Sequence, residues 1–146
     1  MHRRKITILR RFTKELLYVI IPLTHWVNIY EDGQVNILFQ DRKLEKACNN
    51  DALLVRMYGP RRAKILKRRL DEFHAAENLE VLRSLPQSRC HELKGDRNGT
   101  LAVDLEHPYR LIFEPANDPT PRKSDGGLDW SGVTAVRVLT VEDYHG

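Results

Sequence analysis

Cysteine is scarce in this chain, which has two among its 146 residues, Cys48 and Cys90. Two cysteines in a chain of this length do not make the dense disulfide framework of small secreted domains, so we expect reduced thiols and a cytoplasmic protein. The pair also lacks the spacing of zinc ligands, and Cys90 stands directly beside His91. We therefore expect neither a metal site nor another cofactor.

Long apolar runs are scarce as well. The apolar stretch at residues 16–23 is much shorter than the ~20 residues that span a membrane. It contains Pro22, follows Lys14 and Glu15, and leads to no small-residue cleavage site, so it does not fit a signal peptide. A helix lying on a membrane surface stays open as an alternative, although Pro22 would interrupt it.

Internal repeats and low-complexity tracts are absent too, and the remaining composition is that of a folded protein. Hydrophobic residues make up 41% and charged residues 30% of the chain, and a chain of this length normally folds around one core. The formal net charge of +4 suggests an anionic partner such as nucleic acid. Much of the basic charge is concentrated in residues 41–70, where ten Lys or Arg face three Asp or Glu.

The first 34 residues differ from the rest of the chain. They mix basic and apolar side chains without a clear period. Val35 can be encoded by GTG, a bacterial start codon, and residues 31–33 can be encoded by purine-rich codons of the kind found in ribosome-binding sites. We therefore expect residues 1–34 to be an extension with a mis-assigned start, and residues 35–146 to form the working domain.

The body of the chain opens with a predicted strand over residues 35–40 and two helices. Asp41 is a suitable N-cap for the first helix, and Gly59 and Pro60 are suited to end it and start the second. The second helix has one apolar face, formed by Ala63, Leu66, Leu70 and Phe73. A short further turn over residues 79–85 stops at Pro86.

After Pro86 the hydrophobic period changes to two, which is typical of strands. The alternation predicts strands over residues 91–94, 101–105 and 109–115, a loop over 115–132 and a central strand over 133–141. This order predicts an α+β fold: a strand, two helices and an antiparallel strand meander, with the helices packed on one face of the sheet.

Three segments carry a specific resemblance. CHELKGDRNG (Cys90–Gly99), HPYRLIFEP (His107–Pro115) and EDYHG (Glu142–Gly146) resemble HigB-type toxins of the RelE/ParE superfamily, the plasmid-maintenance killer proteins of toxin–antitoxin pairs. The resemblance covers residues 35–146. The loop over 115–132 is longer than in compact HigB proteins.

The resemblance implies a RelE/ParE-like fold and a function. A toxin of this kind is a ribosome-dependent, metal-independent endoribonuclease (an mRNA interferase) that cuts messenger RNA and inhibits translation. Its expected partners are the ribosome, messenger RNA and a HigA-like helix-turn-helix antitoxin, through which alone it would reach operator DNA. The alternative is a non-catalytic ParE-like toxin that inhibits DNA gyrase, but proteins of that kind lack the histidines and the terminal DYH found here.

The resemblance also assigns candidate site residues. The expected catalytic residues are His91, Asp143, Tyr144 and His145, and the expected substrate-binding residues are Lys94 and Arg110. Histidine titrates in the range needed for an acid or a base, and which histidine plays which part stays open. In an extended strand Asp143 and Tyr144 point to opposite faces, so convergence of the site needs a departure from strand geometry. Arg110 has a second interpretation, as an ion-pair partner of Asp104.

The basic face of the second helix is the predicted contact with RNA or the ribosome. Its members stand at helical positions outside the apolar face and are Arg61, Arg62, Lys64, Arg68 and Arg69. The alternative is an ordinary solvated helix face.

Overall fold

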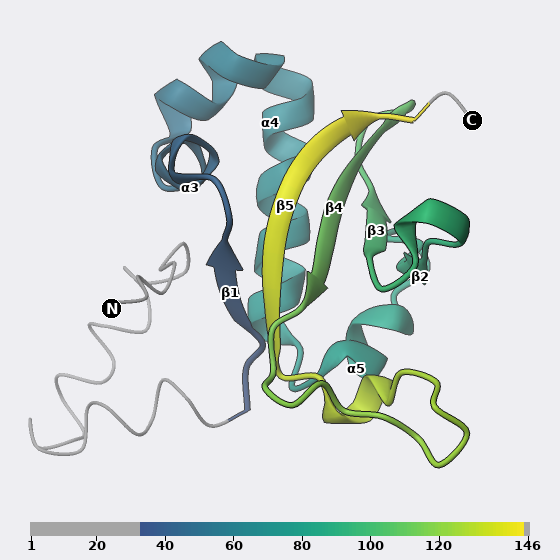
Figure 1. Ribbon diagram of the computed structural model, residues 1–146. Coiled ribbons are helices and arrows are strands. Elements are labelled where there is room, and N and C mark those ends of the chain that lie inside the picture. Colours follow the sequence, from purple (N-terminus) through teal and green to yellow (C-terminus); the bar gives the residue numbers. More distant parts are fainter. Residues whose placement is uncertain (1–32, 145–146) are drawn as a thin grey trace, which may run out of the picture.

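The computed structural model describes residues 33–144, so the predictions for residues 1–32 and for His145 lie outside the described residues. The described chain forms a mixed α+β fold with one five-stranded sheet and three α-helices (Figure 1). The helices α3 (Arg42–Cys48), α4 (Asp51–Ala75) and α5 (Leu79–Arg83) follow the first strand in the chain. The strands are β1 (Asn36–Phe39), β2 (His91–Glu92), β3 (Leu101–Asp104), β4 (Tyr109–Pro115) and β5 (Ala135–Asp143).

The sheet has the strand order β1-β5-β4-β3-β2. The strands from β2 to β5 form an antiparallel meander, and β1 pairs with β5 in parallel. The second strand is shorter than predicted and ends at Glu92, because the chain then turns into the short 3-10 helix η2 (Gly95–Arg97). The long loop after β4 contains a second 3-10 helix, η3 (Trp130–Gly132).

The helical region begins as predicted and then differs from the prediction. The Asp41 side chain accepts a hydrogen bond from the Lys43 amide at 2.8 Å, which confirms it as an N-cap. The prediction of one continuous helix up to Gly59 is wrong. The Asn50 side chain accepts a hydrogen bond from the Leu53 amide at 3.0 Å and so caps a new helix. The expected break at Gly59 is present as a kink inside α4, where Gly59 has a φ of 79° and a ψ of 161°.

The main core lies between the sheet and the helices. In Figure 1, α4 runs behind the central strands, and the predicted apolar face of its second part is buried. Phe73 meets Phe113 of β4 edge to face, with ring centroids 4.9 Å apart. The burial of this face holds α4 against the sheet and contributes to the hydrophobic free energy of the fold.

The opposite side of the sheet has a much smaller apolar cluster. Leu93, Ala102 and Ile112 are buried there, with Leu139 packed against them. We call this side the open face. It carries the polar side chains of the sheet that point away from the helices.

Candidate functional site

A charged cluster lies on the open face at the ends of β3, β4 and β5. The strand register places Asp104 opposite Arg110, and Arg110 opposite Glu142, so the three side chains share one face. The Nε atom of Arg110 lies 3.2 Å from Oδ1 of Asp104, as the second interpretation of this arginine expects. The Arg110 guanidinium also stacks on the Tyr144 ring, with its carbon 4.1 Å from the ring centroid. Two of the predicted site residues are therefore in direct contact.

His91 lies on the same open face, at the edge strand. It stands opposite Ala102, which in turn stands opposite Ile112 of β4, two residues from Arg110. Two strand spacings and two residue rises separate the His91 and Arg110 backbones by about 12 Å. The two side chains extend from the same face, so both can reach one phosphate group bound between them. The Nδ1 atom of His91 is 2.7 Å from the carbonyl oxygen of Arg89.

Lys94 and Arg97 lie in the segment that follows β2. Lys94 is exposed and directly precedes η2. The Arg97 guanidinium makes an ion pair with Glu142, whose hydrogen bond raises the pKa of Arg97 above its usual value. This pair ties η2 to the end of β5. Sequence reasoning did not assign Arg97 to the site, although the residue belongs to the LKGDR segment that carries the resemblance.

Asp143 is placed differently from the other predicted residues. It stands opposite Tyr109, whose ring packs against the helix-side core. By strand alternation Asp143 therefore faces the helix side, while its neighbour Tyr144 contacts Arg110 on the open face. The Tyr144 amide donates to the Pro108 carbonyl at 3.1 Å and keeps this end of the chain extended. The structure thus brings together Arg110 and Tyr144 and puts His91 on their face, but it does not bring Asp143 to them.

The predicted basic residues of α4 differ in exposure. Arg61, Lys64 and Arg68 are exposed, whereas Arg62 is half-buried, with its guanidinium carbon 3.3 Å from the Tyr109 ring centroid. Arg69 is different, because it is only 6% exposed. This arginine therefore has no place on an RNA-binding surface.

Arg69 instead joins three parts of the fold. Its guanidinium donates to the carbonyl oxygens of Asp104 and Gln87, both at 2.7 Å, and to the Glu72 carboxylate at 2.9 Å. A guanidinium has five N–H groups in fixed directions and can bind several acceptors at once. The buried Arg69 therefore stabilises the fold by linking α4 to the end of β3 and to the segment before β2.

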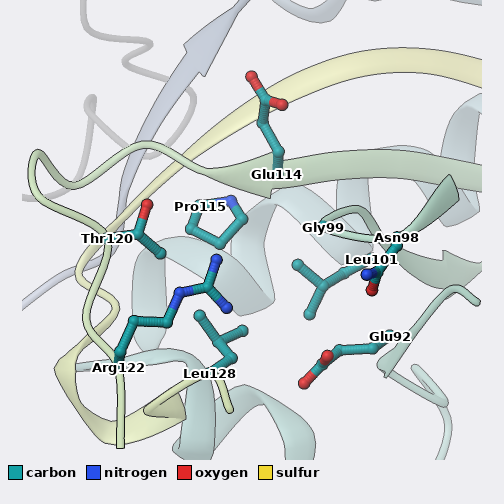
Figure 2. Close-up of a pocket in the computed structure, with 9 residues that line it drawn as sticks. All are labelled: Glu92, Asn98, Gly99, Leu101, Glu114, Pro115, Thr120, Arg122 and Leu128. Atoms are coloured by element: carbon teal, nitrogen blue, oxygen red, sulfur yellow. The ribbon is translucent and has the colours of Figure 1, made fainter. Parts of the chain in front are cut away.

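A pocket of about 300 Å³ lies away from this cluster, between the end of β4, the turn before β3 and the long loop (Figure 2). The residues lining it are Glu92, Asn98, Gly99, Leu101, Glu114, Pro115, Thr120, Arg122 and Leu128. Both carboxylates among these lining residues have partners: Glu92 accepts a hydrogen bond from Trp130 Nε1 at 3.0 Å, and Glu114 pairs with Arg137 at 2.8 Å. Among residues 33–144, none of the predicted site residues lines this pocket.

Both cysteines are buried free thiols, and burial raises the pKa of each to about 12. Within residues 33–144, no three or more His, Cys, Asp or Glu side chains gather closely enough to hold a metal ion. No helix in this part of the chain has the length and apolar character needed to cross a membrane.

Comparison with known proteins identifies one family. The model of the RelE-like toxin of the type II toxin–antitoxin system HigB matches residues 37–120, more than half of the chain. The match includes His91, Lys94 and Arg110 and ends before β5, so Asp143 and Tyr144 lie outside it. No curated protein and no solved structure matches the chain.

Proposed function

The chain belongs to the HigB-like family of RelE-like type II toxins, and we propose that it is a ribosome-dependent endoribonuclease that cleaves messenger RNA and so stops translation. As a type II toxin it has a protein antitoxin as its partner, for which we propose a HigA-like helix-turn-helix protein. The observation that carries the proposal is the common placement of His91, Arg110 and Tyr144 on the open face.

The proposed reaction uses the nucleophile that RNA itself supplies. A base removes the proton of the ribose 2′-hydroxyl, the 2′-oxygen attacks the adjacent phosphorus, and the bond to the 5′-oxygen breaks as an acid protonates the leaving oxygen. The products are a 2′,3′-cyclic phosphate and a 5′-hydroxyl end. The reaction needs two proton-transfer groups and cations beside the phosphate oxygens, and it does not require a metal ion.

The residues of the open face fit these requirements. His91 on the open face and His145, which lies outside the described residues, are the proposed proton-transfer groups. Arg110 is the proposed phosphate ligand, since Asp104 and the Tyr144 ring hold its guanidinium in one orientation before substrate binds. Lys94 supplies a second cation from the exposed segment before η2.

Tyr144 and Asp143 complete the proposed site in different ways. Tyr144 is 39% exposed, so its ring contacts Arg110 on one side and is proposed to stack on an RNA base with the part left open. Asp143 starts on the helix side of the sheet. For it to orient a histidine at the open face, the end of β5 has to turn when RNA binds.

The exposed cations of α4 are proposed to contact ribosomal RNA rather than the cleaved strand. Arg61, Lys64 and Arg68 belong to the helix that covers the other side of the sheet. A protein held between two RNA elements can use one surface for docking and the other for chemistry. We expect substitution of these three residues to weaken ribosome binding in a salt-dependent way without changing the cleavage chemistry.

Translation-coupled cleavage of a defined messenger RNA tests the proposal. We expect the unaltered protein to cut only in the presence of translating ribosomes, and His91→Ala and His145→Ala each to lower the cleavage rate by about 10²-fold or more. His107→Ala is the matched control, because His107 is an exposed histidine in the turn before β4. Cleavage that survives both His91→Ala and His145→Ala would contradict the mechanism. Intact transcripts together with inhibited DNA supercoiling would point to the gyrase alternative.

A further inference from the structure

Arg89 has an unusual backbone conformation close to the proposed site. Among residues 33–144 it is the one non-glycine residue with a positive φ, 45°. L-residues adopt this left-handed conformation at a cost in free energy, and such residues are concentrated where the conformation serves a function. The conformation of Arg89 directs its carbonyl oxygen to within 2.7 Å of Nδ1 of His91, two residues later.

The segment before His91 is held in place by the core. Arg69 Nη2 donates to the Gln87 carbonyl, and Arg69 Nε donates to the Asp104 carbonyl, both at 2.7 Å. The Asp104 amide in turn donates to the carbonyl of the fully buried Ser88 at 2.8 Å. Three hydrogen bonds thus fix residues 87 and 88 relative to β3, so residue 89 cannot relax its φ without disturbing buried groups.

The contact between Arg89 and His91 has a direct chemical consequence. A carbonyl oxygen only accepts hydrogen bonds, so Nδ1 of His91 must be the donor and must carry a proton. The other ring nitrogen, Nε2, is then the one that gains or loses a proton, whether His91 serves as the base or as the acid.

We infer that Arg89 is a positioning residue, whose left-handed backbone holds the His91 ring through Nδ1 and makes Nε2 the nitrogen that exchanges a proton with RNA. This inference rests on the proposed ribonuclease function and deepens it. In the reaction above, the proton of the 2′-hydroxyl moves to Nε2, or the proton on Nε2 moves to the leaving 5′-oxygen, and Nδ1 keeps its proton throughout.

The side chain of Arg89 plays a separate and smaller part. Its Nη1 lies 3.5 Å from Oδ2 of Asp104, but the side chain is 73% exposed, and exposed ion pairs contribute little. A test must therefore separate the backbone from the guanidinium. Arg89→Gly removes the guanidinium and tolerates the positive φ, whereas Arg89→Val removes the guanidinium and disfavours that φ strongly.

The decisive measurement is the tautomer of His91 in the full chain, by NMR with nitrogen-15 in the histidine rings, in the absence of RNA. His91→Ala identifies the signals. In the unaltered protein and in Arg89→Gly, we expect the neutral ring to be protonated at Nδ1 and unprotonated at Nε2. In Arg89→Val we expect a mixture of tautomers. Arg89→Ala, with a smaller penalty at positive φ, provides the comparison if Arg89→Val does not fold.

Messenger RNA cleavage is the second readout. We expect Arg89→Gly to retain the cleavage rate within about threefold. Arg89→Val should cleave about 10- to 100-fold more slowly than Arg89→Gly, the size of effect found when a hydrogen-bond partner that orients a functional histidine is lost. A neutral His91 protonated at Nε2 in the unaltered protein would overturn the inference, as would equal tautomers and rates in the glycine variant and the folded valine or alanine variant. Because the tautomer is measured without RNA, that measurement tests the inference independently of cleavage. Absence of ribosome-dependent cleavage in the unaltered protein would instead refute the proposed function.

Discussion

Arg69 offers the sharpest test of how the fold supports the open face, through Arg69→Met. The methionine keeps an unbranched apolar chain in the core but removes three hydrogen bonds, to two main-chain carbonyls and to Glu72. The Glu72 side chain is only 13% exposed, so the substitution leaves a buried carboxylate without its cation. Breaking a buried ion pair from one side costs about 3–5 kcal/mol, and this range already includes much of the penalty for the unpaired carbonyls.

This loss is a large part of the free energy of unfolding, which is about 5–15 kcal/mol for a typical domain. At roughly 4 °C per kcal/mol for a domain of this size, Tm falls by about 12–20 °C. Thermal and urea unfolding followed by circular dichroism measure both quantities. Arg68→Met is the matched control, since this neighbouring arginine is exposed on the same helix, and its effect should stay within about 0.5 kcal/mol.

A second substitution tests the physical cause. Adding Glu72→Leu to Arg69→Met removes the stranded carboxylate, so we expect the double variant to be more stable than Arg69→Met alone. The reasoning is refuted if Arg69→Met costs no more than Arg68→Met, or if Glu72→Leu lowers the stability of the Arg69→Met variant further.

Three other predictions follow from local features. Gly59→Ala should cost about 1–3 kcal/mol in urea unfolding, because Gly59 has a φ of 79° and a ψ of 161°, although an added Cβ would meet no atom within 4 Å; an unchanged midpoint would contradict the strain. A thiol reagent at pH 8 should label Cys48 and Cys90 slowly in the native protein and rapidly after denaturation, since burial raises the pKa of both thiols to about 12; fast native labelling would refute this. Arg110→Lys should lower messenger RNA cleavage by roughly tenfold, because lysine keeps the charge beside Asp104 but loses the stacking of the planar guanidinium on the Tyr144 ring; an unchanged rate would show that charge alone suffices.

Much of the fold follows from local patterns in the sequence. The cap at Asp41, the break at Gly59 and the buried face around Phe73 each depend on neighbouring residues of the same segment. The strand near the C-terminus was predicted as central from its apolar residues on both faces, and β5 indeed lies between β1 and β4. The break at Asn49 and Asn50 was missed, although asparagine is a common N-cap.

The candidate site was predicted less completely. Motif resemblance selected His91, Arg110 and Tyr144, which share the open face, but it also selected Asp143, which the register of β5 places on the other side. It did not select Arg97 or Arg89. The role proposed for Arg89 depends on its backbone carbonyl. Every residue has a backbone carbonyl, so the amino-acid type does not indicate where that carbonyl points.

Helix caps, hydrophobic periods and short motifs are local features, so the amino-acid sequence was enough to indicate the family, the α+β class and the residue types of the candidate site. The parallel pairing of β1 with β5, the face on which each described site residue lies and the role of Arg69 depend instead on how distant segments pack together. A helical pattern cannot distinguish an arginine that faces solvent from one that faces buried carbonyls. That difference arises from which segments pack against the helix, and contacts between residues far apart in the chain determine it.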